Sequence, residues 1–179
     1  SNFSFKRTAT PPLNSSVRSH MKITWRELTV DLAGRASDEL LNEWRWLVPE
    51  AMSVHMVSAL GDVFLLDASN GVYWLDTGGA ELSRIADSRE HFDVLRQNPS
   101  NADQWFAPQL VGNLMSSGQT LGPFQCFSYK VPLTLGGEFQ QANFAACDLS
   151  VHFHTLGQIQ SQVKNLPVGT PISSVKIGG

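Results

Sequence analysis

The chain has 179 residues, of which 42% are hydrophobic and 16% charged, and its formal net charge is -3. This length and apolar content suit one globular domain with a substantial core. The near-neutral charge, without a cluster of Lys and Arg, argues against a nucleic-acid-binding protein, because such proteins usually carry a basic stripe. No apolar run reaches the roughly 18 residues that a membrane-spanning helix needs.

Residues 1–20 differ in composition from the rest of the chain. They are polar, rich in Ser, Thr and Pro, and show no hydrophobic period. Because Ser19-His20-Met21 resembles a cloning scar, we interpret residues 1–20 as a tag, a linker or a flexible N-terminal arm. Residues 21–179 are then expected to form a single α+β domain. The N-terminal residues also lack the apolar core of a signal peptide, which favours a cytoplasmic protein.

The next part of the chain is predicted to be an extended segment followed by a helix. Residues 22–32 are expected to be extended, and Gly34 is expected to break this segment. Ser37 is a suitable N-cap for a helix that ends before Pro49. Apolar residues at spacings of three or four give this helix one buried face, namely Leu40, Leu41, Trp44 and Leu47.

A β-meander is predicted in the second third of the chain. The runs SVHMVSAL, DVFLLD and VYWLD are rich in β-formers, and Asn70-Gly71 separates the second from the third. Asn-Gly between two such runs is a strong hairpin signal, so we expect three antiparallel strands closed by a turn at residues 77–79. The expected buried face includes Val63, Leu65, Val72 and Trp74.

Residues 88–117 are predicted to be helical. Ser88 can cap a first helix, and Pro99 separates it from a second that starts near Asn101. Pro108 is expected to kink this second helix or to delay its start.

Two strands and a helix are predicted in the last third of the chain. Residues 124–131 form the first strand, and Gly136-Gly137 marks a turn. Residues 148–154 alternate between apolar and polar side chains, which is typical of a half-buried strand, and residues 156–166 follow as a helix. The predicted fold class is therefore α+β, with a mostly antiparallel twisted sheet of hairpins plus two C-terminal strands, packed with about four helices.

The predicted polar strand face is the best candidate for a chemical site. It would place Asp148, His152 and His154 on one side, where a metal ion could reach two imidazoles. The alternative is a solvated polar face, because closed metal sites usually need three or four ligands. Cys126 and Cys147 lie among apolar residues, so we interpret both as buried free thiols.

Several motifs together resemble a known family. They are GDVFLLD at 61–67, YWLD at 73–76, LGGEF at 135–139, LGQI at 156–159 and QVKNLP at 162–167. Over residues 52–172 the chain resembles the C-terminal domain of type VI secretion immunity proteins of the Tdi type. The segment from LGQI onward carries the resemblance most specifically.

The resemblance implies a non-catalytic antidote that binds and neutralises a cognate bacterial toxin, for the namesake group a DNase. No cofactor and no catalytic residue follow from it. Acidic groups that meet the basic cleft of a nuclease are expected, and the acidic stretch of the chain contains Asp62, Asp67, Asp76, Glu81 and Asp87. Two rival hypotheses remain: a metal-binding protein or enzyme that uses Asp148, His152 and His154, and a small-molecule sensor with a pocket of Trp44, Trp74 and Trp105.

Overall fold

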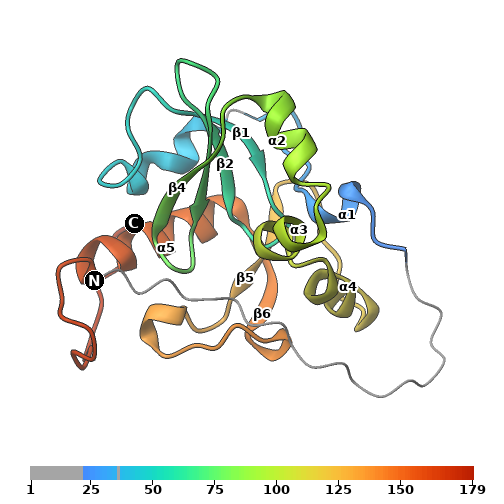
Figure 1. The fold of residues 1–179 in the computed structure, drawn as a ribbon. Helices are drawn as coiled ribbons and strands as arrows, with labels where there is room; N and C mark the ends of the chain where they lie inside the picture. The colour runs from blue at the N-terminus through green and yellow to red at the C-terminus, as the bar shows by residue number, and fades with distance from the viewer. Residues whose placement is uncertain (1–21, 36) are drawn as a thin grey trace.

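A computed structural model describes residues 22–35 and 37–179. Our interpretation of residues 1–20 lies outside these described residues. The fold class is α+β, as predicted, with a four-stranded antiparallel meander and a separate two-stranded hairpin (Figure 1). The strands are β1 Ser53–Val57, β2 Val63–Leu66, β3 Val72–Asp76, β4 Glu81–Ala86, β5 Gln125–Tyr129 and β6 Phe144–Asp148. The helices are α1 Trp25–Leu28, η1 Asp38–Trp44, α2 Arg89–Leu95, α3 Pro99–Phe106, α4 Pro108–Ser116, η2 Leu133–Leu135, η3 Gln141–Asn143 and α5 Leu149–Val163.

The predicted hairpin is present between β2 and β3, and the turn between them is formed by local chemistry. Asn70 adopts a left-handed conformation with φ of 65°, and the Asp67 carboxylate accepts hydrogen bonds from the backbone N–H groups of Ser69 and Gly71. The predicted buried residues of β2 and β3 are all buried. The prediction of three strands was one short, because β4 adds a fourth strand beside β3.

Both faces of the central strand β2 are covered, which explains why its four residues are all buried. The ring of Phe64 lies 4.9 Å from that of Phe92 on α2 and 5.0 Å from that of Phe106 on α3. Aromatic pairs at these centroid distances add to the stability gained from buried area. The helices after the sheet are therefore fixed to it by an aromatic cluster.

Residues 88–117 contain helices, as the capping residue Ser88 and the two prolines predicted. Ser88 caps α2 through a hydrogen bond from the backbone N–H of His91, and Pro99 occupies the first turn of α3. The second predicted helix is divided in two at Ala107, whose φ of 43° ends α3 immediately before Pro108 begins α4.

The first helices differ from their predictions. Within residues 22–32, which were predicted to be extended, Thr24 and Glu27 form a capping box that starts α1. The following helix, η1, is a 3₁₀-helix in which Ser37 makes no side-chain capping bond. Its predicted apolar face is confirmed for Leu40, Leu41 and Trp44, which are buried. The prediction is wrong for Leu47, which lies beyond the end of η1 and is only partly buried.

The predicted strand at residues 148–154 is wrong. The pairing of strand β6 with β5 ends at Asp148. The carboxylate of Asp148 caps α5 by accepting a hydrogen bond from the backbone N–H of Ser150. Val151, predicted to point inward, is 54% exposed. The buried residues follow helical spacing instead, and they include Leu149, His152, Phe153, Leu156 and Ile159.

The hairpin of β5 and β6 is joined to the meander by a backbone hydrogen bond. The N–H of Phe127 donates to the carbonyl of Ala59 at 2.7 Å, beside the end of β1. Cys126 and Cys147 lie opposite each other in this hairpin and are both free thiols, the first buried and the second half-buried. The prediction of a buried thiol is therefore confirmed for Cys126 and is wrong for Cys147, whose thiol is partly exposed.

Candidate functional site

A buried polar cluster connects the meander with α5. Asp62, fully buried, accepts hydrogen bonds from the backbone N–H and the hydroxyl of Thr77 and from the indole N–H of Trp74. His152 of α5 lies with Nε2 3.0 Å from the carbonyl oxygen of Gly61 and 3.2 Å from the Thr77 hydroxyl. Its Nδ1 lies 2.7 Å from the Ser128 hydroxyl.

Burial sets the protonation state of His152. Because desolvation disfavours the imidazolium, it lowers the pKa of His152 to about 4, against an opposing effect of the Gly61 carbonyl. A neutral imidazole fits its neighbours when Nε2–H donates to Gly61 and Nδ1 accepts from Ser128. Gly61 has φ of 83°, and a Cβ there would collide with the His152 ring, so this turn needs glycine.

The three residues of the metal hypothesis do not converge. Asp148 caps α5, His152 is turned into the core, and His154 lies on the outer side of the helix beside Glu43. A separation of two residues puts side chains on nearly opposite sides of a helix, whereas on a strand it would put them on one face. Among the described residues, no three His, Cys, Asp or Glu side chains gather as metal ligands would.

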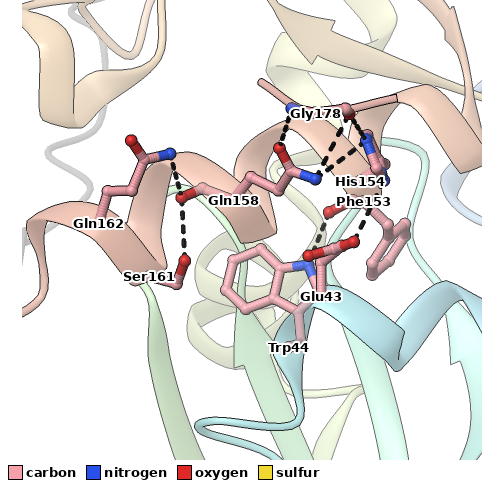
Figure 2. A network of polar contacts seen from close by, with 8 residues as sticks. All are labelled: Glu43, Trp44, Phe153, His154, Gln158, Ser161, Gln162 and Gly178. Atoms are coloured by element: carbon pink, nitrogen blue, oxygen red, sulfur yellow. Dashed lines mark hydrogen bonds and ion pairs between the residues drawn. The ribbon is translucent and has the colours of Figure 1, made fainter. Parts of the chain in front are cut away.

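The tryptophans of the sensor hypothesis are core residues. Trp44, Trp74 and Trp105 are all buried, and the indole N–H of Trp44 donates to the carbonyl of Phe153 at 2.9 Å (Figure 2). Trp105 packs in the aromatic cluster, with its ring 5.7 Å from that of Phe92. These positions indicate structural roles for all three.

The five acidic residues do not form one patch. Asp62 is buried and therefore stabilises the fold instead of meeting a partner. Asp76 and Glu81 are opposite each other on β3 and β4, where Asp76 accepts hydrogen bonds from the backbone N–H groups of Gly78 and Gly79. Asp67 and Asp87 belong to the other end of the sheet.

The Asp67 end of the sheet also holds a cationic group, the guanidinium of Arg84. A Cβ added at Gly71 would meet both the Asp67 carboxylate and the Arg84 guanidinium, so these groups flank the same turn. Arg84 forms an ion pair of 3.2 Å with Asp87, whose side chain is 76% exposed, and His91 lies 3.8 Å from the same carboxylate. Negative charge at this end is therefore partly balanced.

The outer face of α5 holds a polar network that the sequence reading missed (Figure 2). His154, Gln158 and Gln162 recur every four residues, and we call this row the glutamine stripe. Residues 176–178, which we call the strap, run along it. The signal in the sequence was the four-residue spacing. Gln158 and Gln162 lay in the helix predicted at residues 156–166, but the incorrect strand assignment of residues 148–154 separated His154 from them.

Each glutamine of the stripe pairs with one residue of the strap through both halves of its amide. The Gln162 amide accepts from the N–H of Lys176 at 3.0 Å and donates to its carbonyl at 2.7 Å. The Gln158 amide accepts from the N–H of Gly178 at 2.7 Å and faces its carbonyl at 3.5 Å, and His154 Nε2 lies 2.6 Å from that same carbonyl oxygen.

Comparison with known proteins gives a family for part of the chain. Residues 86–160 match the family model described as T6SS immunity protein Tdi1, C-terminal. This segment extends from the last residue of β4 through most of α5. It includes His152, His154 and Gln158.

Comparisons with solved structures and with curated proteins do not add a functional assignment. A solved structure titled "Crystal structure of Atu4351 from Agrobacterium tumefaciens" is similar over 68% of this chain and 62% of its own, with 11% identity and a TM-score of 0.46. The chain thus spans less than two thirds of that relative, and the likeness carries no argument about function. No curated protein matches the chain, and no described helix combines the length and apolar character needed to cross a bilayer.

Proposed function

We propose, from the premise that residues 86–160 belong to the family of T6SS immunity protein Tdi1 C-terminal domains, that this protein binds and neutralises a nuclease toxin of a type VI secretion system. The family match is the observation that carries the proposal. An immunity protein implies a cognate toxin as partner and is not expected to be an enzyme. We place its action in the cytoplasm, where a nuclease would otherwise reach nucleic acid.

The proposed mechanism is direct obstruction of the toxin by a preorganised surface. Rigid surfaces bind well because little conformational entropy is lost on association, and the aromatic cluster and the buried polar cluster both stiffen this fold. Charge supports the nuclease class: acids on the surface can occupy positions that phosphates take in the basic cleft of a nuclease. The acids available for this role are Asp67, Asp76, Glu81 and Asp87.

A co-expression experiment tests the function. The toxin encoded beside this gene should stop growth when produced alone, and growth should recover when the present chain is produced with it. Recovery should be accompanied by a stable complex of the two purified proteins. Continued growth arrest together with no detectable complex would overturn the proposal.

Charge reversal tests the proposed acidic contact. We expect the double variant Glu81→Lys/Asp87→Lys to associate about tenfold more slowly at low salt, because surface charges mainly steer association. Asp67 and Asp76 are left unchanged because their carboxylates hold turns. Glu138→Lys, at an exposed position outside the sheet, is the matched control. Unchanged rates for the double variant would exclude Glu81 and Asp87 as contacts while leaving neutralisation itself intact.

A further inference from the structure

The spacing of residues along the glutamine stripe matches the spacing of residues along the strap. Residues four apart on a helix are separated by about 6 Å along its axis, and alternate residues of an extended chain by about 6.6 Å. Gln158 and Gln162 can therefore meet residues 178 and 176 in register. The residue between them, Ile177, makes no hydrogen bond to the helix and its side chain is 46% exposed.

Recognition of the strap does not depend on its side chains. Every hydrogen bond between the stripe and residues 176–178 goes to a main-chain N–H or C=O. Gly178 is not required for space, since an added Cβ would lie 3.8 Å from the Gln158 amide nitrogen, an ordinary contact distance. The stripe is therefore suited to any extended segment, in the way that a sheet edge accepts a strand.

The strap can also separate readily from the glutamine stripe. Residues 176–178 are all exposed, and their hydrogen bonds to the stripe lie at the surface. Exposed hydrogen bonds contribute little net stability because water replaces them, and segments with few buried contacts open readily. A competing chain can take the same partners without disturbing the buried face of α5.

We propose that the glutamine stripe is a docking site for an extended segment of the toxin, and that the strap occupies this site until the toxin displaces it. The inference rests on the proposed function. Two of its three residues, His154 and Gln158, lie within the segment that matches the immunity family. Val151, one turn before His154 and 54% exposed, adds an apolar contact for a side chain of the incoming segment.

Two variants separate the strap from the stripe. Lys176→Pro/Gly178→Pro removes the two N–H donors of the strap and leaves α5 intact. Ile177→Pro is the matched control, because the same substitution one position away removes no donor to the helix. Gln158→Met/Gln162→Met removes both side-chain amides while keeping side chains of similar length. Thermal unfolding monitored by circular dichroism verifies that each variant is folded.

Affinity for the toxin is the first measurement, with an inactivated form of the toxin encoded beside this gene as the probe. The strap variant should bind about three- to tenfold tighter, since a competitor that lowers the fraction of competent sites has been removed. The stripe variant should bind at least about tenfold more weakly, since the main-chain contacts supply the affinity of this binding mode. Ile177→Pro should bind like the unmodified protein.

Amide hydrogen exchange is the second measurement. In the free protein the amides of Lys176 and Gly178 should exchange about three- to tenfold more slowly than that of Ile177, which has no partner on the helix. In the toxin complex this difference should disappear, while the amides of α5 stay protected. Unchanged affinity in both double variants, or unchanged protection of the strap in the complex, would overturn the inference and show a purely structural strap. Absence of toxin binding by the unmodified protein would instead refute the proposed function.

Discussion

His152 is the residue whose surroundings have the clearest thermodynamic consequence. It is 1% exposed and receives partners from three separate parts of the chain, at Gly61, Thr77 and Ser128. The buried imidazole is neutral. Its hydrogen bonds stabilise the fold only while the ring carries a single proton. Its contribution to stability therefore depends on pH.

We expect the free energy of unfolding to fall by about 3 kcal/mol between pH 6.5 and pH 4 through His152 alone. The pKa is lowered from 6.5 to about 4 in the folded protein, so only the unfolded chain binds the proton within this range. The stabilisation is fully present above pH 6.5 and is lost as the pH falls toward 4. Urea unfolding at a series of pH values measures the slope.

Two histidine variants control this experiment. His152→Asn removes the titrating group, so the slope attributed to it should disappear even though stability at pH 7 is lower. His91→Asn, which replaces a half-exposed histidine on α2, is the matched control for the loss of a histidine. Equal slopes for His152→Asn and the unmodified protein would contradict the assignment.

Helices α5 and η1 approach each other closely at Gly157. At Gly157 a Cβ would lie 2.6 Å from the Cβ of Glu43 and 2.9 Å from its carbonyl oxygen, which is backbone and cannot rotate away. Glycine in the middle of a helix is otherwise unfavourable by about 1 kcal/mol relative to alanine. Its presence here allows the two helices to pack closely.

Gly157→Ala should lower the free energy of unfolding by about 1–3 kcal/mol, because overpacking outweighs the gain in helix propensity. The midpoint of urea unfolding measures the change. Gly112→Ala on α4 is the matched control, since its Cβ would meet only the side chain of Ile23, at 3.2 Å. A stability of Gly157→Ala equal to or above that of Gly112→Ala would show that η1 moves aside.

Elements defined by local chemistry were predictable from the sequence, and elements defined by distant contacts were not. Asn70-Gly71 and Ser88 act on their immediate neighbours, so the hairpin and the start of α2 could be located. The apolar alternation of Leu149, Val151 and Phe153 imitates a strand, and only the capping role of Asp148 favours the helix. The helix predicted at residues 156–166 already contained Gln158 and Gln162, but no pattern in the sequence connects them with residues 176–178.

The candidate site was less predictable than the fold. Asp62 precedes a strand, where acids commonly hold turns. Its burial depends on Thr77 and on the packing of α5, which arrives ninety residues later in the chain. Single-sequence patterns cannot report such a contact, because no periodicity connects these segments.

The whole molecule folds around contacts between the meander and the segment that follows it. Phe127 donates to Ala59 across the two sheets, Gln160 donates to the carbonyl of Gly78, and His152 meets Gly61. In each pair one partner lies between residues 86 and 160 and the other lies before it. The two parts are therefore expected to depend on each other for stability.

A fragment of residues 86–160 should fail to fold cooperatively. It lacks β1, β2 and β3 and would expose the aromatic cluster that covers Phe64. Thermal unfolding followed by near-ultraviolet circular dichroism should show a sharp transition for residues 22–179 and none for the fragment. A sharp transition in the fragment would mean that the helices and the hairpin form a core of their own.

The hydrogen bond from Phe127 to Ala59 links the matched segment to residues that precede it. The boundary of the matched segment therefore differs from the boundary of the folded unit. The match to the family model begins at residue 86, whereas we expect the part of the chain that must be present for folding to begin well before it. Trimming the chain to the matched portion would discard most of the meander, and with it Gly61 and Thr77, two of the three hydrogen-bond partners of His152.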